Sequence, residues 1–193
     1  MKQTIFLLTF AFIFSFVSVA QLDKKTWLVG GSGAASISNS NLNGELFKST
    51  KLSISPNIGY FLFDKFNVGI KTSFEYLKNE NLSPIISYTA KYFSFNIGPF
   101  VRYYFLPKEK RTNLFVETSY QIKTRNSISA GNSSKENAST FSINAGPAIY
   151  FNSSVGIEFT VGYSSTKYKL MTGSYNTLLV GIGLQIHLIK DEK

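Results

Sequence analysis

The sequence contains no cysteine, which excludes a disulfide-stabilised scaffold and a thiolate metal site. Charged residues make up only 16% of the chain, below the roughly one quarter that is usual in soluble proteins. After Ala20 no run of about twenty apolar residues occurs, so a helical membrane span is excluded. The mature chain must therefore obtain its stability from backbone pairing and packing.

The first twenty residues have the features of a secretory signal peptide. A charged start at Lys2 is followed by an apolar run from Ile5 to Val17, and Ser18-Val19-Ala20 has the small-x-small form of a cleavage site. We predict cleavage after Ala20, which leaves one mature domain, residues 21–193. A retained membrane anchor is the alternative, and the cleavage-like ending disfavours it.

The chain is basic, with a formal net charge of +9 at pH 7. A basic exported protein can meet nucleic acid or anionic lipid head groups. The charge alone does not choose between these partners.

Beyond Thr26 the chain alternates apolar residues with small or polar ones, which is typical of β-strands. In the last such segment Leu178, Val180 and Ile182 share one face, while Gly181 and Gly183 lie on the other. Eight segments of this kind occur, and an even number is expected for an antiparallel barrel with both ends on one side. The predicted strands are 26–36, 51–62, 66–77, 91–105, 113–124, 140–151, 154–165 and 176–189.

The strand charges all lie on the small and polar face. A soluble barrel would turn the apolar face inward, whereas a membrane barrel turns it toward lipid and keeps polar groups in the lumen. The polar face is rich in glycine, serine and asparagine, as a crowded interior requires, and the opposite face carries more large apolar side chains than a small soluble core could pack. These features predict an all-β fold, an eight-stranded antiparallel up-and-down transmembrane β-barrel. The charged residues in question are Lys71, Glu75, Arg102, Glu117, Lys123 and Glu158.

Short and long connections alternate between the predicted strands. Short periplasmic turns and longer external loops are expected in this order for outer-membrane barrels, which places both termini in the periplasm. The predicted short turns are 64–65, 107–111 and 152–153, and the predicted long loops are 37–50, 78–90, 125–139 and 166–175.

Aromatic residues gather near the strand ends, which favours two belts at the membrane–water interfaces. Trp27 is expected to anchor the first strand at the inner interface. The predicted inner belt contains Tyr60, Phe61, Phe63, Phe66, Tyr103, Tyr104, Phe105, Tyr150 and Phe151, and the outer belt contains Tyr76, Tyr88, Tyr92, Tyr163, Tyr168 and Tyr175.

Three prolines lie inside predicted strands, where proline cannot donate a ladder hydrogen bond. Because a missing bond is costly in lipid, we expect a local bulge or kink at Pro56, Pro99 and Pro147. The pairs Gly98-Pro99 and Gly146-Pro147 indicate a repeated device.

Four segments carry a resemblance to a known family. They are residues 55–61 (SPNIGYF), 96–105 (NIGPFVRYYF), 114–117 (LFVE) and 183–186 (GLQI), the last similar to a C-terminal insertion signal. The whole mature chain resembles the small outer-membrane β-barrel domain of Gram-negative bacteria, of the porin-family, OmpA/OmpX type. The resemblance implies an outer-membrane location, insertion by the barrel-assembly machinery and contact with outer-membrane lipids including lipopolysaccharide.

Four charged residues should lie at similar depth in the lower lumen, namely Lys71, Arg102, Glu117 and Glu158. We predict that they form an internal salt-bridge cluster. A charged constriction that selects ions is the alternative. An eight-stranded barrel is just wide enough for its own side chains, which favours the structural interpretation.

The sequence offers no catalytic, cofactor-binding or metal-binding set. His187 is the only histidine, and on an inward position near the periplasmic rim we expect it to be a lumen residue. Lys167 and Lys169 could hold lipopolysaccharide phosphates or be part of a solvated rim, and the rim is favoured.

The sequence therefore predicts a monomeric outer-membrane barrel with a structural or surface-interaction, adhesin-like role, without catalysis, cofactor or nucleic-acid partner. The alternatives are a narrow channel for small solutes, an enzyme acting on membrane lipids, and an exported lipocalin-like binding protein.

Overall fold

The computed structural model describes residues 22–42, 45–82, 87–129, 132–169 and 173–188. The predicted signal peptide, residues 1–20, lies outside the described residues. None of the described residues belongs to a helix long and apolar enough to cross a membrane.

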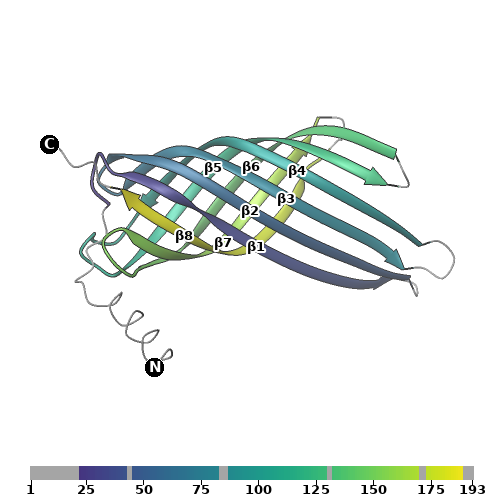
Figure 1. The fold of residues 1–193 in the computed structure, drawn as a ribbon, viewed down its shortest axis with the longest axis horizontal. Coiled ribbons are helices and arrows are strands. Elements are labelled where there is room, and N and C mark those ends of the chain that lie inside the picture. Colours follow the sequence, from purple (N-terminus) through teal and green to yellow (C-terminus); the bar gives the residue numbers. More distant parts are fainter. Residues whose placement is uncertain (1–21, 43–44, 83–86, 130–131, 170–172, 189–193) are drawn as a thin grey trace, which may run out of the picture.

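The described residues form a closed barrel in which each strand pairs antiparallel with its neighbours in chain order (Figure 1). The predicted fold class is confirmed. We call the end near the two chain termini the proximal end, and the opposite end the distal end. The strands are β1 (Trp27–Leu42), β2 (Glu45–Phe63), β3 (Phe66–Leu82), β4 (Ser87–Tyr104), β5 (Thr112–Ser129), β6 (Asn132–Tyr150), β7 (Val155–Tyr168) and β8 (Tyr175–Leu188).

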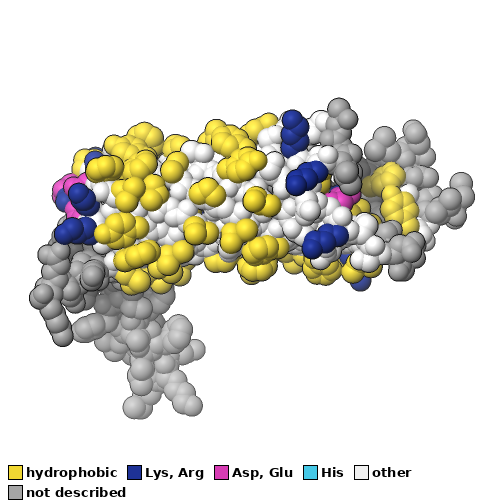
Figure 2. Space-filling model, turned by 90° about the horizontal axis from the view of Figure 1, so that it is seen from above, with side chains coloured by type: hydrophobic (Ala, Val, Ile, Leu, Met, Phe, Trp, Pro, Cys, Tyr) yellow, Lys and Arg dark blue, Asp and Glu magenta, His cyan; other side chains and the backbone are white. Residues whose placement is uncertain are grey.

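Alternate residues point to opposite sides of the barrel wall, as the period of two predicts. On β8, Ile182 and Leu184 are exposed on the outside, while Gln185 and His187 are buried inside. Figure 2 shows hydrophobic side chains over the middle of the wall, with lysine and arginine toward its two ends. The barrel therefore places its large apolar side chains outward.

Three of the predicted long loops, 37–50, 78–90 and 125–139, are wrong for most of their length, whereas of the described residues in 166–175 only 166–168 and Tyr175 belong to strands. Pairing continues from β1 into β2 as far as Leu42 and Glu45, and from β5 into β6 as far as Ser129 and Asn132. Serine, asparagine and lysine in these segments were interpreted as loop residues, but an antiparallel ladder needs only backbone groups. Where the strands pass beyond the apolar band, neither face has to be hydrophobic.

The three prolines interrupt pairing without the expected bulge. On β4, the pairs with β5 stop at Ile97–Ile122 and resume in the same register at Phe100–Ser119. On the other side of the strand, Pro99 stays paired with Ile70. The same two-residue gap occurs at Pro56 between β2 and β3 and at Pro147 between β6 and β7.

Close strand approach explains the glycines that precede two of these prolines. A Cβ atom on Gly98 would lie 2.0 Å from the carbonyl oxygen of Tyr120, and one on Gly146 would lie 1.7 Å from that of Phe159. The neighbouring strand therefore occupies the space of a side chain at both positions.

Candidate functional site in the barrel interior

The structure brings the four charges of the predicted cluster together inside the barrel. Lys71 comes from β3, Arg102 from β4, Glu117 from β5 and Glu158 from β7, and all four side chains are buried. Their positions on inward-facing alternate residues follow from the strand pattern. Arg102 and Glu117 are direct partners in the β4–β5 register.

Glu117 is the centre of this cluster. Its carboxylate accepts hydrogen bonds from Arg102 Nε at 3.0 Å and Nη2 at 2.5 Å. It also forms an ion pair with Lys71 and accepts a hydrogen bond from Asn144 Nδ2 at 3.3 Å. Glu117 thus contacts both buried cations, and together with Glu158, which pairs with Arg102, it balances their two charges, as a low-dielectric interior requires.

The guanidinium of Arg102 joins the two carboxylates. Its Nη1 lies 2.7 Å from Glu158 Oε1, and it also donates to the Tyr104 hydroxyl at 3.1 Å. Gln185 Nε2 donates to the second oxygen of Glu158 at 3.1 Å. The guanidinium lies 4.7 Å from the centre of the Phe115 ring. Charge pairing and ring contact together fix this arginine across the lumen.

A second group of ion pairs lies on the distal side of this cluster. The sequence analysis did not predict it as a group. Lys123 Nζ lies 2.6 Å from Glu75 Oε2, and Lys51 Nζ lies 4.0 Å from the same oxygen. Asn96 donates to the other Glu75 oxygen at 3.1 Å. The inward parity of Glu75 and Lys123 was visible in the sequence, but their proximity depends on the β3–β4–β5 register.

A third group, formed by one ion pair and two aromatic rings, lies at the distal end of the lumen. Arg125 donates to Glu136 at 2.7 Å, and its guanidinium lies 4.8 Å from the Tyr92 ring centre and 4.4 Å from that of Tyr168. Both tyrosines were predicted for the outer membrane belt. That prediction is wrong for these two, because they face inward and hold Arg125.

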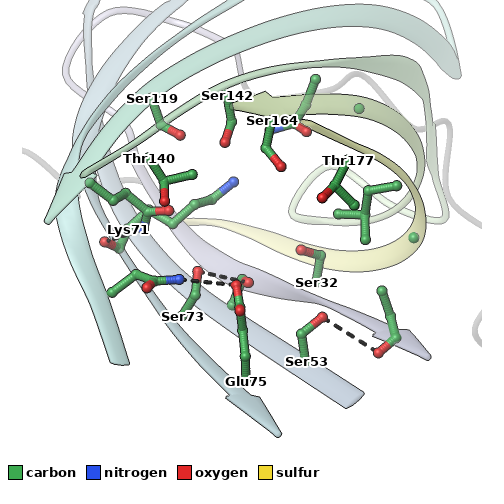
Figure 3. Close-up of a pocket in the computed structure, with 18 of the residues that line it drawn as sticks. Ser32, Ser53, Lys71, Ser73, Glu75, Ser119, Thr140, Ser142, Ser164 and Thr177 are labelled. Carbon is green, nitrogen blue, oxygen red and sulfur yellow. Dashed lines mark hydrogen bonds between the residues drawn. The ribbon is translucent and has the colours of Figure 1, made fainter. Parts of the chain in front are cut away.

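A polar cavity of about 250 Å³ lies between these groups (Figure 3). Hydroxyl groups from many strands face it, because serine and threonine occupy alternate inward positions. Its lining includes Ser32, Ser53, Ser119, Thr140, Ser142, Ser164 and Thr177.

The proximal end of the lumen is filled by a plug of buried side chains. It contains the following residues, all buried and in mutual contact: Leu22, Leu28, Phe61, Tyr104, Phe115, Ala148 and Tyr150. Phe61, Tyr104 and Tyr150 were predicted for the inner membrane belt, and this prediction is wrong because they fall on inward positions. Tyr60, Phe63 and Tyr103 do lie on the outside.

His187 belongs to this plug region. Its ring is stacked on Phe61 at 5.7 Å and meets Tyr150 edge-on at 5.5 Å. The N-terminal segment closes over the same end, since Lys65 N donates to the carbonyl oxygen of buried Leu22 at 2.7 Å. No three His, Asp or Glu side chains among the described residues form a group that could hold a metal ion.

Two partly exposed ion pairs lie toward the ends of the barrel. At the proximal turn, the hydrogen bond from Lys108 to Asp23 raises the pKa of Lys108. On distal β3, Lys78 donates a hydrogen bond to Glu80 at 2.7 Å.

The barrel is similar to solved structures of small outer-membrane proteins. Neisserial surface protein A matches at 15% identity over 83% of this chain and 96% of its own, with a TM-score of 0.53. The outer-membrane protein OprG of Pseudomonas aeruginosa matches at 11% identity over 90% of this chain and 100% of its own, with a TM-score of 0.53. No protein-family model and no curated protein matches the chain.

The chain has the fold of a small outer-membrane β-barrel.

In a barrel of this kind, the arrangement of the lumen limits what can pass through it. The plug at the proximal end and the charge cluster on its distal side place large buried side chains in the lumen, and an eight-stranded barrel is just wide enough for its own side chains. The cavity lies on the distal side of the cluster. The interior can therefore hold water or a small ligand that enters from the distal half.

Proposed function

We propose that this protein is an integral outer-membrane β-barrel with a structural or surface-interaction role and no catalysis. The observation that carries the proposal is the sorting of side chains across the barrel wall. Large apolar side chains such as Phe95, Phe159 and Ile182 are exposed outside, whereas Arg102 and Glu117 are buried inside. Such a surface is stable in hydrocarbon and would aggregate in water.

The sealed proximal lumen supports a non-channel role. A solute would have to displace the ion pairs of Arg102 with Glu117 and Glu158, and then the aromatic plug. Breaking a buried, hydrogen-bonded ion pair costs several kcal/mol. The polar lumen also argues against a lipocalin-like carrier, which would need an apolar interior.

Contact with outer-membrane lipids, including lipopolysaccharide, is part of this proposal. Lys78 and Lys91 face each other across β3 and β4, immediately beyond the outward aromatic pair Tyr76 and Phe93. Like charges placed directly opposite repel. Glu80 pairs with Lys78, and a lipid phosphate beside Lys91 would reduce the repulsion in the same way. Lys167 and Lys169 are also exposed near the same end.

The distal strand extensions support a surface-interaction role. β5 and β6 remain paired to Ser129 and Asn132, well beyond outward Tyr120 and Phe141 of the apolar band. These extensions form a firm polar projection on which an external partner could be bound, which is the adhesin-like version of the role. We expect insertion by the barrel-assembly machinery, a signal peptide that ends at Ala20, periplasmic termini and a monomer.

Cell fractionation with heat-modifiable gel migration tests this proposal. We expect the full-length protein in the outer-membrane fraction, with faster migration before boiling than after. Release of folded protein into detergent-free extracts would contradict the membrane location and favour an exported soluble protein.

A further inference from the structure

We use the word seam for the boundary along which two neighbouring strands pair. Among the described residues, the β1–β8 seam is the one in which both strands continue for several residues beyond their last shared pair. β1 pairs with β8 from Trp27–Leu188 to Gly33–Ile182 and no further. Continuing this register would place Ala34 opposite Gly181 and Ile37 opposite Leu178, but these pairs are not formed. Figure 1 shows the two strands together at the proximal end and separated toward the distal end.

In each of the other seams, at least one of the two strands is paired to its distal end or to within one residue of it. The pairing of β4 with β5 reaches Ser129, and that of β6 with β7 reaches Tyr168, which are the last residues of β5 and β7. At the β1–β8 seam, in contrast, pairing ends at Gly33–Ile182, well before the distal end of either strand. The backbone ladder between β1 and β8 is thus incomplete in its distal part, and we call this unpaired stretch the opening.

Side-chain exposure marks the same opening. Leu178, Val180 and Ile37 are 79%, 74% and 70% exposed, the highest values among the large hydrophobic side chains that the structure describes. Outward apolar residues run along β8 from Leu188 to Leu178, about the length that spans a bilayer core. The opening therefore lies in the distal part of the apolar band and faces lipid.

Unpaired backbone at membrane depth is tolerated where it borders a polar cavity. Here the interior cavity is lined by Thr177, Leu179 and Gly181 of β8 and by Ser32 and Ala34 of β1. Both edges of the opening are thus walls of the cavity, and Figure 3 shows Ser32 and Thr177 facing it from the two sides. The cavity lining therefore reaches both strands that border the opening.

The cavity has an excess of positive charge. Its lining contains five cationic side chains and three carboxylates, namely Lys51, Lys71, Arg102, Lys123 and Arg125 against Glu75, Glu117 and Glu158. Arg125 is paired with Glu136 outside the lining, so the excess amounts to one positive charge. Lys51 is the cation next to the opening, because it pairs in register with Ser36 of β1. It lies 4.0 Å from Glu75 Oε2, an oxygen already bound more closely by Lys123. An anionic group beside Lys51 would compensate its charge.

The outer face next to the opening is apolar and hollowed. A groove of about 800 Å³ begins at Gly33, Ala34 and Ala35 of β1, the segment that borders the opening on its other side. The small outward residues Gly33 and Ala35 leave room for a chain to cross β1. The groove continues between Leu52, Ile54, Phe74, Tyr76, Phe93 and Phe95.

We propose that the β1–β8 opening is a lateral binding site for a single-chain anionic amphiphile, a long-chain carboxylate taken from the lipid layer. The carboxylate enters the cavity beside Lys51, and the hydrocarbon chain crosses β1 into the outer groove. The proposal rests on the outer-membrane location given under the proposed function. The positive charge of Lys51 in the cavity matches the carboxylate of this ligand, and the apolar outer groove matches its hydrocarbon chain.

A disulfide cross-link across the opening tests the proposal. Because the native chain contains no cysteine, only the introduced pair can be oxidised to a disulfide. The probe is dansyl-labelled undecanoic acid, titrated against the full mature protein in lipid vesicles, with its methyl ester as the uncharged comparison. In the double variant Ile37→Cys/Leu178→Cys, we expect oxidation to reduce binding at least about tenfold and reduction to restore it. The matched control is Val29→Cys/Ile186→Cys, at a pair already formed and outside both the cavity and the groove, where oxidation should leave binding unchanged.

A second variant does not depend on the cross-link. Lys51→Gln should weaken binding of the acid about tenfold and leave binding of the ester unchanged. The lateral site is excluded if the acid shows no saturable binding, if Lys51→Gln binds it as the native protein does, or if the closed cross-linked variant retains full binding.

Heat-modifiable migration of the same vesicle samples separates this result from the proposed function. A folded, membrane-inserted protein that does not bind the acid contradicts only the lateral site. A protein that does not insert into vesicles contradicts the proposed function.

Discussion

Arg102 and Glu117 show what the sequence predicts for a single residue and what only the structure adds. The period of two predicts that both side chains point inward, and the structure places them in direct contact at 2.5 Å. The sequence pattern could not predict the Glu75–Lys123 pair, because this contact depends on strand tilt and register rather than on parity. The inward tyrosines at positions 92, 104 and 168 were misplaced for a related reason: aromatic type was weighed above position in the alternation.

Removing the carboxylate of Glu117 should be strongly destabilising. Glu117→Gln leaves Lys71 and Arg102 with too little negative charge in the interior, and breaking a buried pair costs about 3–5 kcal/mol. Urea unfolding of vesicle-inserted protein, followed by the fluorescence of Trp27, measures this loss.

The matched control is Glu136→Gln at the distal end of the lumen. Its partner Arg125 is less buried and is also held by Tyr92 and Tyr168, so the cost should be about 1 kcal/mol or less. Equal losses for the two variants would contradict a buried, mutually dependent cluster.

At the scale of the strand, positions and pairing order are predictable from the sequence, whereas strand length is not. The predicted strand 113–124 corresponds to β5, which continues to Ser129. The boundary was placed where hydrophobic alternation fades, yet hydrogen-bonded pairing continues through Arg125–Glu136 and Ser127–Ser134. The composition of a strand therefore indicates where the apolar band ends, and not where hydrogen-bonded pairing ends.

Hydrogen exchange distinguishes a paired extension from a loop. Amides of β5 and β6 between Arg125 and Glu136 should exchange more slowly than unstructured peptide by about two orders of magnitude or more, because ladder hydrogen bonds protect them. Exchange at the unprotected rate throughout this segment, in protein inserted in vesicles, would restore the long-loop interpretation.

The glycines before the strand prolines give a second prediction at this scale. Gly146→Ala should lower the yield of folded protein sharply, because its Cβ would overlap the carbonyl oxygen of Phe159. Gly33→Ala is the control, since its Cβ would lie 3.8 Å from the carbonyl oxygen of Ser53, an ordinary van der Waals distance. The yield is read from the heat-modifiable band after refolding; similar yields for both variants would contradict the close strand approach.

For the whole molecule, the sequence predicts a closed barrel but not how its interior is filled. The plug joins Leu22 from the N-terminal segment to Phe61, Phe115 and Tyr150 from three different strands. No local pattern marks such a set, because its members meet only after the barrel closes. The same applies to the incomplete β1–β8 seam, since the pairing of the first strand with the last depends on how the barrel closes.

The plug predicts that the protein does not conduct. Planar bilayers containing the purified barrel should show no stable single-channel steps. The double variant Phe61→Ala/Tyr150→Ala removes two large side chains from the plug and should raise the rate of brief openings. Stable steps in the native protein, with unchanged behaviour in the variant, would favour the narrow-channel alternative.

The central claim is that bulky apolar side chains face hydrocarbon while ionised ones lie inside the barrel. The most direct test places a single tryptophan on either side of the wall, in a Trp27→Phe background, and measures quenching by lipids brominated on their acyl chains. Outward Phe159→Trp should be strongly quenched and inward Phe115→Trp should be nearly unaffected, because these residues are 46% and 2% exposed. Strong quenching at position 115 with protection at position 159 would contradict the account.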